Sequence, residues 1–265
     1  GHIDLIVAQE DGRAAFLKNS GEVVGGMPDF FPPVFFRQRA EYLKVGVLPT
    51  PFAVDWDDDG DMDLIAGDTA GYLNLVENLG GGAHPSWAAP VHLQAGGETI
   101  RIQAGANGSI QGPAEAKWGY TVCNVADWDG DGLKDIVINS IWGEVLWYRN
   151  CGAKNAAKLE KVRPVEVKWD GPTPKPAWCW WTPKGNQLVT QWRTTPGVID
   201  WNGDGLNDLV MLDQEGYLAF FERVKGGNGM ELLPGKRIFQ DAQGKPLRLN
   251  EKAAGKSGRR KFTFV

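Results

Sequence analysis

One nine-residue pattern occurs three times in this chain, and it constrains the possible fold more than any other feature. Each copy has Asp or Asn side chains at positions 1, 3, 5 and 9, Trp at position 2 and Gly at position 6. The three copies span residues 55–63, 127–135 and 200–208. Residues 1–5 match the end of the pattern, which makes Asp4 the ninth position of an incomplete fourth copy. Repetition at such spacing predicts a fold assembled from similar units.

The side chains of this pattern are the ligands that a hard divalent cation requires. Carboxylate and amide oxygens at alternate positions, with a glycine at the bend, are typical of Ca²⁺ loops. We therefore expect Ca²⁺ as the cofactor. The predicted ligands are Asp55, Asp57, Asp59, Asp63, Asp127, Asp129, Asp131, Asp135, Asp200, Asn202, Asp204 and Asp208, together with Asp4.

The residues after each loop distinguish a helical calcium motif from a β-rich one. An EF-hand loop needs Glu at position 12 and flanking helices, but Ala66, Ile138 and Met211 occupy that position. Short apolar runs follow instead, then a glycine suited to a hairpin turn, then a second apolar run. These glycines are Gly12, Gly71, Gly143 and Gly216. The sequence therefore predicts antiparallel strands around each loop.

The spacing of the repeats indicates how the strands are grouped. Each unit is interpreted as strand, metal loop, strand, tight turn, strand and a weaker fourth strand. The fourth strands are expected at 33–37, 90–93, 164–169 and 236–240. The ninth-position residues lie 59, 72 and 73 residues apart, which favours the four-stranded blades of an all-β β-propeller over another all-β repeat array. The approximate blades are 1–54, 55–126, 127–199 and 200–265. The chain starts inside one pattern and stops where another is due, so we expect part of a ring of about seven blades, the remaining ones missing from this chain.

The pattern also resembles a known repeat family. Asp-x-Asp-x-Asp-Gly-x-x-Asp followed by Leu or Ile, a strand, a turn glycine and a strand is similar to the FG-GAP/VCBS repeat, over essentially the whole chain. The family includes integrin α heads and secreted bacterial polysaccharide lyases. The resemblance implies calcium in the loop of each blade, on the face opposite the ligand face. Such loops suit the Ca²⁺ affinities of extracellular modules, roughly 10⁻⁴–10⁻³ M, so we expect an extracellular or periplasmic protein.

The charge of the chain is divided unevenly between the loops and the rest. The chain has 33 acidic and 28 basic residues, a net charge of −5. The three complete loops contain 13 of the acidic residues, and subtracting these from 33 leaves 20 against 28 basic ones. With the loops neutralised by cations, the remaining surface is basic, which favours an acidic glycan or other anionic ligand over no partner at all. We expect no nucleic acid partner, and no apolar run approaches the ~20 residues of a membrane span.

Three long segments before the Asp-Trp pairs are the candidate ligand site, because function concentrates in long loops on a rigid scaffold. They are 94–117, 170–191 and 241–258. Seven residues before the first Asp of a loop stand Leu48, Tyr120 and Arg193, and Arg259 takes the same place at the end of the chain. Equivalent residues converge on the axis of a propeller, so these should border one depression. The predicted substrate-binding residues around it are Trp118, Trp178, Trp180, Trp181, Trp192 and Arg260.

Indole faces stack on sugars and arginines pair with carboxylates, so we expect a secreted propeller that acts on an acidic polysaccharide, by β-elimination. Arg193 and Arg259 would neutralise the uronate carboxylate, while Tyr120 or Lys117 would transfer protons. Similar propeller lyases that act on ulvan use histidines, and none stands at these positions. A non-catalytic glycan- or protein-binding propeller and a purely structural one are the alternatives, and the tryptophans would then hold the long loops in place.

Overall fold

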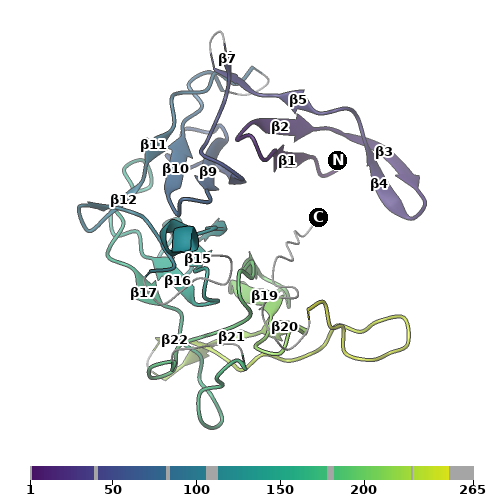
Figure 1. Ribbon diagram of the computed structural model, residues 1–265, viewed down its shortest axis with the longest axis vertical. Coiled ribbons are helices and arrows are strands. Elements are labelled where there is room, and N and C mark those ends of the chain that lie inside the picture. Colours follow the sequence, from purple (N-terminus) through teal and green to yellow (C-terminus); the bar gives the residue numbers. More distant parts are fainter. Residues whose placement is uncertain are drawn as a thin grey trace.

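The computed structural model describes residues 2–38, 41–81, 84–105, 113–177, 182–227 and 229–250. Within these ranges the protein is all-β, and its antiparallel sheets follow one another along an open arc (Figure 1). The only helical segment of the described residues is a 3₁₀ turn, η1 (Pro113–Lys117). The predicted all-β class is confirmed. These residues close no ring, so the propeller architecture and its number of blades stay predictions.

Two sheets have four strands each, and in both of them the strands lie side by side in the order of the chain. The second sheet of the arc consists of β8 (Thr50–Val54), β9 (Asp63–Gly67), β10 (Leu73–Val76) and β11 (Val91–His92). The third sheet consists of β14 (Cys123–Ala126), β15 (Asp135–Asn139), β16 (Val145–Tyr148) and β17 (Arg163–Pro164). The second strand of each, β9 and β15, is fully buried, which explains why the sequence shows no alternation there.

The sheets at the two ends of the arc have three strands each. The first sheet consists of β1 (Leu5–Ala8), β2 (Ala14–Leu17) and β5 (Val34–Phe35). The fourth sheet consists of β18 (Gly197–Ile199), β19 (Asp208–Leu212) and β20 (Leu218–Phe221). The fourth strand expected at 236–240 is reduced to one bridge between Phe220 and Lys236.

Four two-stranded hairpins lie between or beside these sheets, and the sequence did not predict them. They are β3 (Asn19–Val24) with β4 (Met27–Phe30), β6 (Arg37–Gln38) with β7 (Glu41–Tyr42), β12 (Gln94–Ala95) with β13 (Glu98–Thr99), and β21 (Arg223–Gly226) with β22 (Gly229–Leu232). The last of them lies next to the third and fourth sheets in Figure 1.

The predicted turn glycines are confirmed. Gly12, Gly71, Gly143 and Gly216 join the second and third strands of the four repeats, each with a φ between 78° and 90°. Glycine is required there for a second reason, because a Cβ would meet a backbone oxygen of the segment that leads to the next sheet. At Gly71 that atom is the carbonyl oxygen of Ile102, 1.8 Å from the Cβ position. The hairpin turns are therefore packed against their neighbours.

The strand before each metal loop belongs to the same sheet as the strands after it. Strand β8 pairs with β9, β14 with β15 and β18 with β19. The sheets thus begin at Thr50, Cys123 and Gly197, whereas the predicted blade limits at 54/55, 126/127 and 199/200 divide each sheet between its first and second strands. Strand β14 lies beside both β8 and β18.

The core lies between consecutive sheets. One cluster of buried side chains, with Trp56 at its edge, joins the second sheet to the third. An equivalent cluster with Trp128 joins the third sheet to the fourth. Trp56 and Trp128, at the second loop position, thus pack between repeats, whereas Trp201 at the same position is 41% exposed. No helix in the described ranges is long and apolar enough to cross a membrane.

Candidate functional site

The candidate metal centres lie in the loops that join the first and second strands of a sheet. In loop 55–63 the carboxylates of Asp55, Asp57 and Asp59 converge, and in loop 127–135 those of Asp127, Asp129 and Asp135 do so. Within each group the candidate ligand oxygens lie no more than 4.8 Å apart. Three carboxylates at this separation form a site that could hold a metal ion.

Loop 55–63 also contains carboxylate oxygens that the fold buries without a donor. The Oδ1 atoms of Asp55, Asp57 and Asp61 are buried and accept no hydrogen bond. Buried carboxylate oxygens normally have a partner, and a bound cation would supply one. Asp61 was not among the predicted ligands, because it stands at position 7, where the other two loops have Leu133 and Leu206.

The Asp at the ninth position has a structural role that the sequence did not indicate. Its Oδ1 accepts the backbone N–H fifteen residues later in all four repeats, at 2.7–2.8 Å. In the three complete loops its Oδ2 also accepts the N–H of the second-position Trp, at 2.9–3.0 Å. Burial raises the pKa of Asp135 to about 6, and the charges of Asp129 and Asp131 act in the same direction. A nearby cation would favour the ionised form of this residue.

The chain supplies two cations of its own to these loops. In loop 127–135 the guanidinium of Arg149 donates to Asp129 and, at 2.8 Å, to Asp131. In loop 55–63 the ammonium of Lys134, from the next loop along the chain, lies 3.2 Å from Asp58 and 3.7 Å from Asp55. The loops are thus partly neutralised by the protein, and a metal ion would share or displace these contacts.

Loop 200–208 is organised differently. The Nδ2 of Asn202 donates to Asp204 at 3.0 Å, so the amide turns its donor toward the neighbouring carboxylate. Among the described residues, groups of three acidic side chains close enough for a metal occur in the two preceding loops and not in this one. This loop has Asn202 where the other two loops have Asp, and it also has fewer converging carboxylates.

The seven-back positions share one backbone conformation. Leu48, Tyr120 and Arg193 have φ values of 50°, 49° and 55°. Residues other than glycine rarely adopt such a backbone conformation. Each donates its N–H to the carbonyl two residues before the turn glycine of the preceding repeat, at 3.3–3.4 Å. These residues are therefore equivalent, as the counting predicted, and precede β8, β14 and β18 at the strand ends remote from the metal loops.

The structure corrects the role proposed for Arg193. Its side chain is 4% exposed and its guanidinium pairs with Glu115 of η1, which is 2% exposed. The guanidinium carbon lies 3.6 Å from the ring centre of Tyr120 and 4.1 Å from that of Trp192. An arginine enclosed and paired in this way is not available to the carboxylate of an external glycan, so we assign it a structural role.

The other residues predicted for this site are divided. Trp192 is buried in a small cluster with Ala104 and Ile141, which makes it a packing residue and corrects its assignment to the ligand site. Trp118 packs edge-on against Tyr120, both half-buried, and Lys117 is exposed at the end of η1. Trp178, Trp180, Trp181, Arg259 and Arg260 lie outside the described residues. The structure thus brings Trp118, Tyr120, Trp192 and Arg193 together around a buried ion pair.

Comparison with known proteins adds no identity to this geometry. No protein-family model matches the chain, and no curated protein matches it. The resemblance to FG-GAP/VCBS repeats therefore stays a prediction that rests on the loop, turn and strand spacing.

Proposed function

We propose that this chain is part of a calcium-stabilised β-propeller of the FG-GAP/VCBS type that works outside the cell as a binding module for an acidic glycan. The observation that supports this best is the convergence of three carboxylates at the same place in two successive repeats. Oxygen-only ligand sets of this kind favour Ca²⁺ or another hard cation over zinc or copper.

The metal would act on stability through the contacts of the loop. Each complete loop is tied to its own sheet by the ninth-position Asp, whose two oxygens accept backbone N–H groups. A cation held by the same loop would offset the repulsion among its carboxylates. Binding to the folded state alone would then raise the free energy of unfolding.

Binding without turnover is the form of this function that the described residues support. A lyase needs an accessible cation for the uronate carboxylate, and Arg193 is enclosed by Glu115, Tyr120 and Trp192. Lys117 and Tyr120 alone do not complete the machinery of β-elimination. The polysaccharide lyase therefore becomes the second candidate, to be decided by the release of unsaturated uronate from acidic polysaccharides.

Calcium titration tests the proposal. We expect isothermal calorimetry to show binding to the chain, and Asp57→Asn and Asp129→Asn each to remove one site or weaken it. Asp29→Asn, which alters an exposed carboxylate on β4 outside the three complete loops, is the matched control. No heat of binding and an unchanged melting temperature at millimolar Ca²⁺ would refute the metal-binding function.

A further inference from the structure

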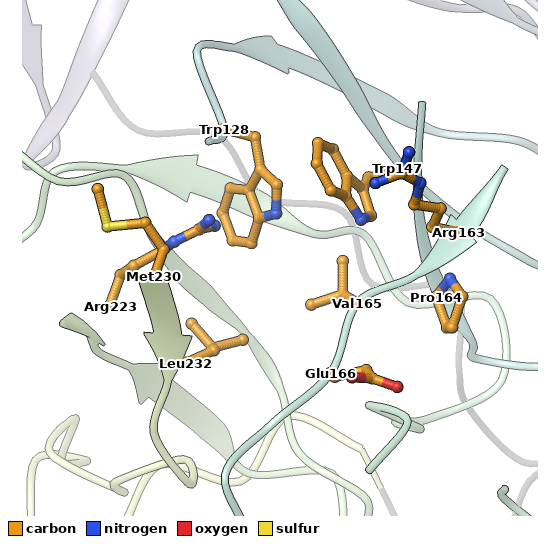
Figure 2. A pocket seen from close by; sticks show the side chains of 9 residues that line it. All are labelled: Trp128, Trp147, Arg163, Pro164, Val165, Glu166, Arg223, Met230 and Leu232. Carbon is orange, nitrogen blue, oxygen red and sulfur yellow. The ribbon is translucent and has the colours of Figure 1, made fainter. Parts of the chain in front are cut away.

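A cavity of about 400 Å³ lies between the third sheet and the β21–β22 hairpin. Figure 2 shows the indoles of Trp128 and Trp147 along one side of it and Val165 and Leu232 along the other, with the guanidinium of Arg223 next to Trp128. Its volume falls in the range of small-molecule sites, roughly 300–1,000 Å³. None of the described residues of the predicted ligand loops lines it.

The preceding repeat has different residues at this place. In the second sheet Leu75 of β10 pairs with Val91 of β11, two aliphatic residues. The equivalent pair, 72 residues later, is Trp147 with Arg163. An aliphatic pair has thus been replaced by an indole and a guanidinium, which lies 5.8 Å from the centre of that indole.

Arg223 is the third departure from the repeat. The same position holds Asn19, Asn78 and Asn150 in the other repeats, and each asparagine accepts the N–H two residues later, which closes a turn. An arginine cannot close the turn in this way. The guanidinium instead stacks on Trp128 at 3.8 Å.

The environment of Arg223 does not satisfy its side chain. The residue is 6% exposed, yet its Nη1 is buried without a hydrogen-bond partner and it forms no ion pair with another described residue. A buried guanidinium without a partner is costly, and a scaffold position that asparagine fills elsewhere does not require it. This points to a ligand that completes the site.

The chemistry of the lining limits what that ligand is. Its polar groups are mainly donors: the guanidinium of Arg163, which pairs with Glu160, the guanidinium of Arg223, and the indole N–H groups of Trp128 and Trp147. The two indole N–H groups hydrogen-bond to no described residue. Glu166 at the edge is the single carboxylate of the lining. The complementary ligand presents acceptors, a negative charge and an apolar ring face that packs on indole.

We propose that this cavity binds an acidic sugar residue, with its carboxylate at Arg223 and its ring against the tryptophans. The inference rests on the proposed acidic-glycan function and gives it a site different from the long loops.

The neighbouring metal loop would control the affinity. The carboxylates of Asp129, Asp135 and Asp127 act on the Arg223 guanidinium, so they also repel an anionic ligand held there. A cation in loop 127–135 would cancel that repulsion. Calcium is therefore expected to tighten sugar-acid binding, and by linkage the sugar acid should tighten calcium binding by the same factor.

The test is a titration of the whole chain with oligogalacturonate, in millimolar Ca²⁺, followed by calorimetry and tryptophan fluorescence. Arg223→Asn should weaken binding roughly ten- to a hundredfold, and Trp147→Leu roughly two- to tenfold. Both variants introduce the residue of an equivalent repeat position, so the fold should tolerate them. Arg101→Ala is the control, since its guanidinium also lies on an aromatic ring, that of Tyr72 at 4.7 Å, in another sheet.

Three results would overturn the proposal: no binding by the unaltered chain, equal affinity for a neutral glucose oligomer, or unchanged affinity in Arg223→Asn. The calcium titration of the same samples separates the two levels of inference. If calcium binds and oligogalacturonate does not, the sugar-acid cavity fails while the metal-binding function stands. If neither binds, both fail.

Discussion

Two neighbouring interfaces of this protein are built from equivalent positions of the repeat, but only the second borders the cavity described above. Between the second and third sheets, Trp56, Leu75 and Leu159 belong to one continuous cluster and the turn asparagine Asn150 closes its own loop. Between the third and fourth sheets, Trp128 and Leu232 occupy the equivalent places, but Arg223 and Trp147 border a cavity. A few side-chain exchanges at one interface between repeats can therefore accompany the formation of a cavity there.

At its other end, the interface between the third and fourth sheets contains a buried ion pair. Arg193, before β18, pairs with Glu115, before β14, at the strand ends remote from the metal loops. The seam thus combines a well-packed end with an open one. The predictions below measure how much each end contributes.

The largest effect is expected from Arg193→Ala. The substitution leaves Glu115 buried without its partner, which costs about 3–5 kcal/mol. Urea unfolding should show this loss, whereas Arg193→Met combined with Glu115→Leu should recover most of it. A neutral result for the single variant would mean that the pair is solvent-exposed in solution and would reopen Arg193 as a ligand residue.

Truncation of the two equivalent tryptophans measures the difference in packing directly. Trp56→Ala should lower the free energy of unfolding by about 3–4 kcal/mol, and Trp128→Ala by at least about 1 kcal/mol less, because one side of Trp128 already borders the cavity. Equal losses in chemical denaturation would show that the two interfaces are packed alike.

Calcium removal should affect both interfaces. At a hundredfold excess over the dissociation constant, each bound ion adds about 2.7 kcal/mol to the free energy of unfolding. Chelation is therefore expected to lower the melting temperature measured by calorimetry. A chain with both Asp57→Asn and Asp129→Asn should lose most of this response, and an unchanged response there would place the metal elsewhere.

Substitutions at the asparagine position should have unequal effects on stability at the two interfaces. Asn150→Ala removes the acceptor for the N–H groups of Gly152 and Lys158, with an expected loss of about 1–2 kcal/mol. Arg223→Asn restores the residue of the other repeats and removes a buried guanidinium, so it should cost less than about 0.5 kcal/mol. A large loss in Arg223→Asn, seen in urea unfolding, would make Arg223 a structural residue.

The smallest effect is expected in loop 200–208. Asn202→Asp adds a fourth carboxylate to this loop and should raise its calcium affinity a few-fold, roughly 1 kcal/mol or less. Calorimetry on a chain that also contains Asp57→Asn and Asp129→Asn isolates this site. If the affinity falls, the side chain at position 3 does not face the metal.

Much of the local structure was predictable because it depends on short-range chemistry. The turn glycines, the strands on both sides of each loop and the oxygen ligands at alternate positions follow from backbone conformation and ligand type, which a nine-residue pattern specifies. The positive φ shared by Leu48, Tyr120 and Arg193 shows that even the register between repeats was present in the spacing. Asp61 was missed because the pattern assigns position 7 no side-chain role.

The partners of buried side chains could not be predicted in this way. The sequence does not distinguish an arginine that pairs with a buried carboxylate from an arginine that binds a ligand. Arg193 and Glu115 are 78 residues apart, and only packing of the segments before β14 and β18 brings them together. Arg223 was not among the predicted site residues, although it lines the cavity.

The sequence by itself determined the all-β class, the repeated unit and the acidic loops, because each depends on residues within one repeat. Only the tertiary structure decided which of the charged and aromatic residues are accessible, because burial is a property of the seam between repeats. Three residues differ from those at equivalent positions of neighbouring repeats: Trp147, Arg163 and Arg223. Their differences can be interpreted only in the tertiary structure, where the third and fourth sheets face each other. Their convergence on one cavity is what the fold adds to the chain.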